Sequence, residues 1–369
     1  MNKDIKEVKL FIGPQHPGIT GNMSIEIDVQ GDTIKRAVTH VGYLHRAFEK
    51  LMEMRSFIQI PPLVCRICVP EPDTNEENFA RAIEELAGID IPERSKWIRT
   101  LVLELSRLQM LIMWYGGMAG SMGLSTAPQL GIGDRDYVLD LFEELTGGRI
   151  YHIYIIPGGV RRDIPDGFED RVEDVLSYLE KRMPMYDDLI LGNAVFLRRI
   201  KELPVIKKEW VDQMGLTGPV ARGCGFRYDV RKDSPYEAYG YLDFDVITEK
   251  GCDMLSIIKV RRREIDLSIK LIRQIFNRIP YGDFWNRIPN PFTWKIQRGE
   301  TYVKSEATRG EYGFYVVTDG TDKPRRIHVR GPSYIHSITL LERILKGANI
   351  SDVSPILVAL QTCPPEIER

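Results

Sequence analysis

The segment at residues 252–279 constrains the fold most, because its apolar residues recur at helical spacing along its whole length. The same period predicts further helices at residues 75–88, 92–116, 134–147, 167–182, 184–200 and 206–214, and another at about 333–347. A chain of 369 residues with 43% apolar residues can bury such helices in a large core.

Strand patterns occupy both ends of the chain. Residues 8–42 alternate between apolar and polar positions, and Gly31-Asp32 predicts a hairpin turn within them. Residues 300–330 alternate in the same way around the turn sequence TDGTDKP. The last segment, DVSPILVALQTCPPEIER, is predicted to begin as a strand and to end in a Pro-Pro turn.

These patterns predict an α+β fold, in which a central helical bundle carries antiparallel β-sheets at its periphery. We expect one domain over residues 1–369. Its parts are a β-rich N-terminal part (1–60), a helical core (61–290) and a β-rich C-terminal part (291–369).

The most apolar run, residues 108–124, is slightly short for a membrane span and is interrupted by glycines. It predicts a buried helix that ends at the glycine pair 116–117. The charged start MNKDIKEVK lacks the apolar stretch of a signal peptide. Membrane contact is therefore expected through another subunit, and a net charge of −2 gives no reason to expect nucleic acid as a partner.

The five cysteines are an odd, sparse set for so long a chain, which predicts no disulfide framework and a reducing cytosol. Cys224 and Cys252 are expected to be core or structural residues. Cys65 and Cys68 form a Cys-x-x-Cys motif around Arg66, whose charge is expected to lower their pKa. Such a pair could exchange with a sulfur–sulfur bond, supply two metal ligands with Cys363 as distant partner, or pack as small apolar groups.

Other polar motifs are weaker when taken singly. His16 lies at the tip of the turn GPQHPG, where it is either solvated or aimed into a cleft as a proton donor. Arg46 and Glu49 share one helical face and predict a simple ion pair. The glycines of TRGE (308–311) and RGPS (330–333) predict sharp backbone bends. The RRRE run at 261–264 is expected on a solvated or subunit-contact face.

Taken in order, these motifs cover nearly the whole chain: GPQHPG, VGYLHRAFEK, RIC, LELSRLQMLIMWYG, RDYVLDLFEELTGGRIYHIYIIPGGVRRDIP, GLTGPVARGCGFRYDVRKDSPYEAY, EATRGEYGFYVVTDG and RGPSY. They closely resemble the large catalytic subunit that nickel–iron hydrogenases share with respiratory complex I. In complex I this is the 49 kDa subunit. The resemblance implies a helical bundle with peripheral sheets, docked on a small subunit that carries a [4Fe–4S] cluster.

The chain departs from the hydrogenases at the metal ligands. The resemblance implies four thiolates, but only Cys68 and Cys363 match them, while Glu71 and Glu366 occupy the other two positions. Cys65 lies outside that pattern. Soft thiolates select a nickel–iron centre, so we expect these residues to be vestiges of a metal site that holds no metal. We expect no cofactor in this chain and [4Fe–4S] clusters in its partner subunits; another metal on Cys68, Cys363 and nearby carboxylates stays an alternative.

The chain departs from complex I as well. In that family a hairpin histidine and a tyrosine bind the quinone head group; His16 matches the histidine, but Val69 occupies the place of the tyrosine. The combination is similar to the large subunit of the archaeal membrane-bound sulfane sulfur reductase.

That resemblance implies ferredoxin-dependent reduction of sulfane sulfur, such as polysulfide, coupled to ion transport. The expected partners are ferredoxin, the small [4Fe–4S] subunit, other iron–sulfur subunits, and membrane-arm subunits that include antiporter-like modules. The chain is then a peripheral subunit on the cytoplasmic face of the membrane. The expected catalytic residues are Cys65 and Cys68 as thiols, Arg66 as their cation, and His16 and Glu49 as proton donors.

Three alternatives remain open from the sequence. The first is a quinone reductase that has lost its tyrosine, and the second is a residual nickel–iron hydrogenase. The third is a non-catalytic scaffold between an electron-carrying arm and a membrane module.

Overall fold

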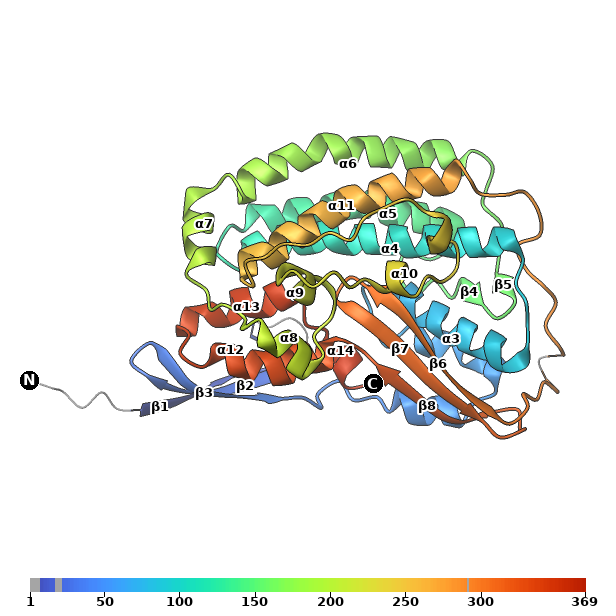
Figure 1. Ribbon diagram of the computed structural model, residues 1–369, viewed down its shortest axis with the longest axis horizontal. Helices are drawn as coiled ribbons and strands as arrows, with labels where there is room; N and C mark the ends of the chain where they lie inside the picture. The colour runs from blue at the N-terminus through green and yellow to red at the C-terminus, as the bar shows by residue number, and fades with distance from the viewer. Residues whose placement is uncertain (1–6, 17–21, 291) are drawn as a thin grey trace, which may run out of the picture.

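The computed structural model describes residues 7–16, 22–290 and 292–369. Long helices form a bundle on one side, and the sheets and short helices lie along its other side (Figure 1). The predicted α+β architecture is confirmed: a helical bundle with antiparallel sheets at its periphery.

The bundle consists of α4 (Glu93–Gly120), α5 (Thr126–Thr146), α6 (Phe168–Ile190) and α11 (Met254–Phe276). α4 is central, because it packs against both α5 and α11 and because most of its residues are buried. The remaining helices are α1 (Phe48–Glu53), η1 (Phe57–Gln59), α2 (Pro61–Val64), α3 (Pro72–Ala87), α7 (Ala194–Lys201), α8 (Glu209–Met214), α9 (Gly218–Gly223), α10 (Val230–Asp233), η2 (Tyr239–Tyr241), η3 (Ile335–Leu340), α12 (Leu341–Leu345), η4 (Ile350–Asp352), α13 (Val353–Leu360) and α14 (Pro364–Ile367).

Each sheet is antiparallel. The N-terminal sheet has the order β1 (Glu7–Ile12), β2 (Ser24–Gln30), β3 (Thr33–His40), and the C-terminal sheet has the order β6 (Gly299–Ala307), β7 (Gly310–Thr318), β8 (Pro324–Arg330). A two-stranded ribbon pairs β4 (Ile155–Ile156) with β5 (Gly159–Val160). Gly31 has a φ of 64° in the β2–β3 turn, so the hairpin predicted there is confirmed.

The prediction that the helix ends at the glycine pair 116–117 is wrong, because α4 continues to Gly120. A Cβ atom on Gly116 would lie 2.4 Å from the carbonyl oxygen of Ala127, and one on Gly120 would lie 2.3 Å from Pro128 Cγ. These glycines therefore allow α5 to approach α4 closely instead of ending the helix.

The predicted break near residue 183 and the predicted C-terminal strand are also wrong. α6 continues through Pro184, and the break comes at Asn193, whose side chain caps α7 by accepting from the N–H groups of Val195 and Phe196. The segment SPILVAL lies in α13, since a short apolar run has no period that separates a buried helix from a strand.

Cys224 and Cys252 form a disulfide, contrary to the expectation of none. It joins the end of α9 to the residue before Asp253, which caps α11 by accepting from the N–H of Ser256 at 2.7 Å. The RRRE run at 261–264 was expected on a solvated or subunit-contact face. This is wrong for Arg261 and Glu264, which are fully buried.

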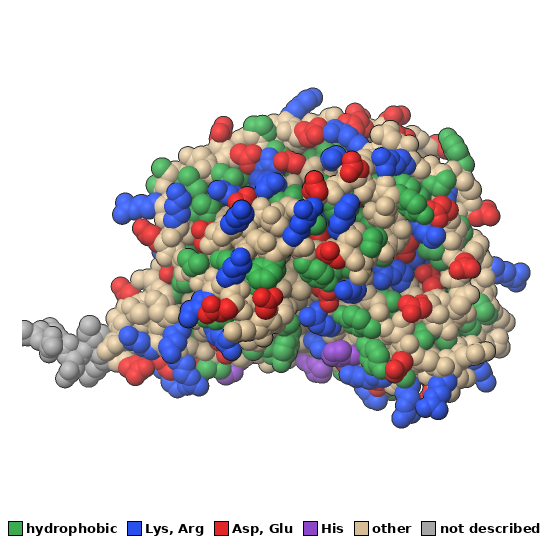
Figure 2. Space-filling view, in the orientation of Figure 1, with side chains coloured by type: hydrophobic (Ala, Val, Ile, Leu, Met, Phe, Trp, Pro, Cys, Tyr) green, Lys and Arg blue, Asp and Glu red, His purple; other side chains and the backbone are tan. Residues whose placement is uncertain are grey.

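Basic and acidic side chains are interspersed over the helices on the face shown in Figure 2. Ion pairs join neighbouring helices, as between Arg273 of α11 and Glu173 of α6 at 2.7 Å. Among the described residues, no helix combines the length and the apolar character needed to cross a membrane.

Replacing both Cys224 and Cys252 with Ser is expected to lower the free energy of unfolding by about 2–4 kcal/mol, because the bridge limits the unfolded chain. Thermal unfolding with and without a reductant measures this change. The reductant should lower the midpoint temperature of unfolding of the wild type and leave that of the double variant unchanged. Equal midpoint temperatures for the two proteins without reductant would contradict the prediction.

Candidate functional site: a buried pair of thiols

Cys68 is placed by a short loop between two helices that begin with proline. α2 starts at Pro61, α3 starts at Pro72, and the loop between them turns Cys68 into the interior, where its side chain is fully buried. Proline is favoured in a first helical turn because its missing N–H needs no partner there. The sequence PPLVCRICVPEP therefore fixes both ends of the loop.

Cys363 and Glu366 come from the C-terminal segment. Cys363 precedes α14, and its N–H donates to Ser333 Oγ at 3.3 Å, while the N–H of Ser333 donates to Glu366 Oε1 at 2.8 Å. A Cβ atom on Gly331 would lie 2.0 Å from Glu366 Oε1, so this carboxylate can lie here only beside a glycine. The missing side chain of Gly331 makes room for Glu366, and Gly331 is not among the residues with a positive φ.

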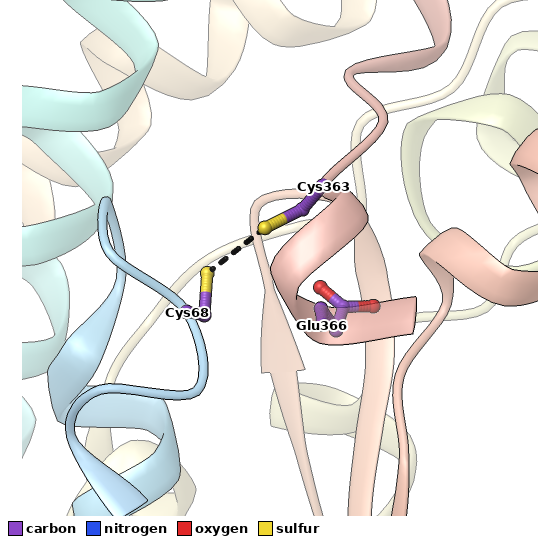
Figure 3. Close-up of side chains that lie close together, drawn as sticks. All are labelled: Cys68, Cys363 and Glu366. Atoms are coloured by element: carbon purple, nitrogen blue, oxygen red, sulfur yellow. Dashed lines mark hydrogen bonds between the residues drawn. The ribbon is translucent and has the colours of Figure 1, made fainter. Parts of the chain in front are cut away.

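The sulfur atoms of Cys68 and Cys363 lie 3.6 Å apart and point toward each other from opposite ends of the chain (Figure 3). We call these two residues the thiol pair. Cys65, the other half of the Cys-x-x-Cys motif, donates instead to the carbonyl of Pro62 at 3.4 Å. The structure thus brings together the two cysteines that match hydrogenase ligands.

Arg309, at the tip of the β6–β7 hairpin, contacts three of the four residues that the sequence analysis placed at metal-ligand positions. Its Nη2 lies 2.8 Å from Cys68 Sγ and 2.9 Å from Glu71 Oε2, and its Nε donates to Glu366 Oε2 at 3.0 Å. All these side chains are buried. Sequence reasoning missed this role and noted Arg309 only as part of the charged turn TRGE.

Glu71 is held from a second side. The N–H and the hydroxyl of Thr308 donate to its two carboxylate oxygens at 2.8 and 2.7 Å. Glu71 and Glu366 are therefore both bound by protein donors. Cys68, Cys363 and Glu366 offer three ligand atoms within 4.8 Å of one another, but two sulfurs and a carboxylate already paired with Arg309 do not fit a nickel–iron centre held by four thiolates.

The two thiols of the pair are not equivalent. The hydrogen bond from Cys68 lowers the pKa of Cys363, with a further contribution from the Arg309 charge, whereas burial raises the pKa of Cys68 well above its usual value. These opposite shifts favour Cys363 as the more acidic thiol of the pair.

Burial raises the pKa of Cys65 to about 12, against the expectation that Arg66 lowers it. Arg66 does donate to Cys65 Sγ at 3.3 Å and to the carbonyl of Pro62 at 2.5 Å, and it stacks over Tyr151. Its effect on the Cys65 thiol is smaller than the cost of removing a thiolate from water.

A cavity of about 1040 Å³ opens beside the thiol pair. Cys363 and Arg309 form part of its wall, and Val69, Met110 and Trp114 contribute to the largely apolar remainder. The other lining residues are Pro70, Met113, Gly117, Gly120, Ser121, Gly123, Ser125, Pro128, Gln129, Ser354, Val358, Gln361, Thr362, Pro364 and Pro365. The Cys363 sulfur thus lies beside a largely apolar chamber.

His16 and Glu49 are not part of this cavity wall as far as the described residues show. His16 is exposed, and its N–H donates to the carbonyl of Gly13; residues 17–21 of its turn lie outside the described part. Glu49 pairs with Arg326 at 2.7 Å and with Arg369 at 2.9 Å. The ion pair expected between Arg46 and Glu49 is replaced by these contacts.

The chain matches the family model described as the respiratory-chain NADH dehydrogenase 49 kDa subunit over residues 121–292 and 290–369. It is 44% identical to an NADH-quinone oxidoreductase subunit of Thermosipho melanesiensis over 365 residues, covering 98% of this chain and all of that protein. It is 34% identical to an F(420)H(2) dehydrogenase subunit of Methanosarcina mazei, with 98% of each chain covered.

A solved structure of the membrane-bound sulfane sulfur reductase, an archaeal respiratory membrane complex, contains a similar chain. It superposes with a TM-score of 0.96, 41% identity and complete coverage of both chains. The fold and these similarities define a large subunit of respiratory oxidoreductase complexes. The chain belongs to the family of the 49 kDa subunit of the respiratory-chain NADH dehydrogenase.

Replacing Arg309 with Met is expected to destabilise the protein by about 3–5 kcal/mol, because Glu71 and Glu366 would be left buried without their cation. Denaturant unfolding measures the change. Arg326→Met is the matched control, since Arg326 is half-exposed and its pairs with Glu49 and Glu53 should contribute about 1 kcal/mol or less. Equal losses in the two variants would contradict this account.

Proposed function

We propose that this chain is the catalytic large subunit of a membrane-bound complex that reduces sulfane sulfur with electrons from reduced ferredoxin. The observation that carries the proposal is the thiol pair, with sulfurs 3.6 Å apart and Cys363 in the wall of the cavity. Thiols so close can close to a disulfide with small movements and can exchange with other sulfur–sulfur bonds. The similarity to a sulfane sulfur reductase chain supports the same chemistry.

The proposed cycle begins with attack by the Cys363 thiolate on a sulfane bond, R–Sx–Sy–R′. An S–S bond forms between Cys363 and the Sx fragment, and the Sy fragment leaves as an anion that takes the Cys68 proton. The Cys68 thiolate then displaces the Sx fragment and closes a Cys68–Cys363 disulfide. Two electrons and one proton restore the thiol pair, and a second proton neutralises the Sx fragment. In total, two electrons and two protons cleave one S–S bond.

Arg309 is the cation of this cycle in our proposal. Its guanidinium contacts Cys68 and lies in the cavity wall with Cys363, where it stabilises whichever sulfur is negative. Cys65 and Arg66 are proposed to hold the loop that carries Cys68. The proton-donor roles expected for His16 and Glu49 stay predictions.

The proposal also includes the surroundings of the chain. [4Fe–4S] clusters in a small subunit and in other iron–sulfur subunits would carry electrons from ferredoxin to the thiol pair, with no cofactor or metal in this chain. Membrane-arm subunits, including antiporter-like modules, would couple the reaction to ion transport. The chain would then be peripheral, on the cytoplasmic face of the membrane.

Quinone reduction is the second candidate, and the cavity favours it. A mostly apolar chamber of about 1040 Å³ has room for a quinone head group, and several relatives are named quinone oxidoreductases. Val69 in the cavity wall offers no hydroxyl to the head group. This second activity would need no thiol pair.

Replacing Cys363 with Ser in the complete complex should lower ferredoxin-driven trisulfide reduction by roughly two orders of magnitude or more, because the attacking thiolate is lost. Cys68→Ser should allow one attack and then stop with substrate bound to Cys363, which intact-mass measurement detects. Ser354→Ala, in the same cavity wall, is the control and should retain turnover.

Four outcomes separate the alternatives. If Cys65→Ser loses activity while Cys363→Ser keeps full activity, the reacting thiols are Cys65 and Cys68 and not the thiol pair. Quinone turnover that survives both Cys68→Ser and Cys363→Ser would favour the quinone reductase. Stoichiometric nickel in the purified complex would favour the hydrogenase. Unchanged turnover in every cysteine variant would favour the non-catalytic scaffold.

A further inference from the structure

Helix α3 buries an unusual row of polar side chains. It lies between the C-terminal sheet and α4 (Figure 1), and every residue from Asp73 to Asn78 is buried. In a soluble fold such a helix normally turns apolar residues toward the core, so this polar row has to be compensated.

Many polar atoms of this row have no hydrogen-bond partner among the described residues. They are Asp73 Oδ2, Asn75 Oδ1, both carboxylate oxygens of Glu77, Asn78 Oδ1 and Arg81 Nη1. Buried polar atoms are normally bonded to protein or to internal water, and an orphan acceptor is costly. Internal water molecules beside this helix would satisfy these atoms.

The first end of the row meets the thiol pair. Glu71 directly precedes α3, and its carboxylate contacts Arg309, which in turn donates to Cys68. The side-chain amide of Asn75 donates to the carbonyl of Glu71 at 3.3 Å. The polar row therefore begins within the candidate site.

The second end of the row opens at the surface. A pocket of about 480 Å³ is lined by Arg81, Glu84 and Glu237, together with Glu85, Ile89, Asp90, Ile91, Lys96, Pro235 and Tyr236. Arg99 lies beneath it and is fully buried. Its guanidinium contacts Glu84 at 2.5 Å, Glu237 at 3.0 Å and Glu77 at 3.8 Å.

The charges at this end do not balance if every acid is ionised. Glu77, Glu84 and Glu237 share the single buried cation Arg99, and Arg81 approaches Glu77 only to 3.9 Å. Burial and the neighbouring Glu237 raise the pKa of Glu77 well above its usual value, which favours the protonated form of this carboxyl. A buried neutral acid beside water is a proton carrier.

We infer that α3 is the route by which protons pass from the surface pocket beside Glu237 to the thiol pair, with Glu77 as the relay residue. Glu77 is six positions from Glu71, or about 9 Å along the helix at 1.5 Å per residue, a distance that two or three water molecules span. The inference rests on the proposed function only in requiring that reduction at this site consumes protons, which sulfane and quinone reduction both do.

The test replaces Glu77 with Gln in the complete complex, which keeps the shape and removes the titrating group. The redox-difference infrared spectrum should lose a carboxylic-acid C=O band that shifts in D₂O, and steady-state turnover should fall roughly tenfold or more. The first, single attack on substrate should keep its rate, because it draws its proton from Cys68. Glu180→Gln is the matched control, because Glu180 is an exposed helical acid on α6 outside this pocket, and it should change neither signal.

An unchanged band and unchanged turnover in Glu77→Gln would overturn the inference. If that variant does not assemble, Glu77→Asp serves instead: it keeps a carboxyl on a side chain shorter by one methylene, so the band should shift in frequency and turnover should fall. An unshifted band with unchanged turnover in that variant would also overturn the inference. If the wild type reduces quinone and not trisulfide, the proposed function fails, while slow quinone turnover in Glu77→Gln would still support the route.

Discussion

A single buried cation organises the site of this protein. Arg309 has to be compensated where it lies, because an unpaired guanidinium in the interior costs several kcal/mol. Its partners come from the loop before α3 and from α14, so the pairs with Glu71 and Glu366 bring the two cysteines together. Cys68 and Arg309 are separated by 241 positions in the sequence, yet one guanidinium contacts the sulfur and both acids.

The same arrangement determines what the thiols can do. The Arg309 guanidinium supplies positive charge beside the two sulfurs, and a guanidinium, unlike a metal ion, does not take up thiolates as ligands. Burial keeps the proton on Cys68, while Cys363 faces the cavity and is the more acidic thiol. Cys363 and Arg309 thus lie at the wall of an apolar chamber, with the Cys68 sulfur directly behind them.

Buried charge is a general feature of the helical part, beyond this site. Arg222 contacts Glu264 and Glu306 at 2.7 Å each, and Arg231 contacts Asp229 at the same distance, all inside the fold. Such pairs are weak contributors to net stability but strongly penalise any arrangement that separates them. α3 differs in carrying an unbroken run of buried polar side chains, from Asp73 to Asn78, beside the candidate site, which is why water and protons are inferred there.

Much of the fold could be predicted from the sequence alone. The period of α11, the strand alternation at both ends and the turn at Gly31 are local patterns, and each leads to the observed element. The order of motifs also led, by resemblance, to Cys68, Glu71, Cys363 and Glu366 as one group, which the structure brings together. The predicted element boundaries or types were wrong where tertiary packing determines them. These places are the glycines of α4, Pro184 in α6, and α13.

Which thiols meet, which acids are neutral and which cation joins them were decided by the tertiary structure. The Cys-x-x-Cys spacing suggested Cys65 and Cys68 as partners, but the sulfur nearest to Cys68 belongs to Cys363, and the charge beside it to Arg309. Electrostatic energies depend on distance and burial, which local sequence patterns do not encode. The sequence determined the elements and the residue types at the site; their long-range contacts determined its chemistry.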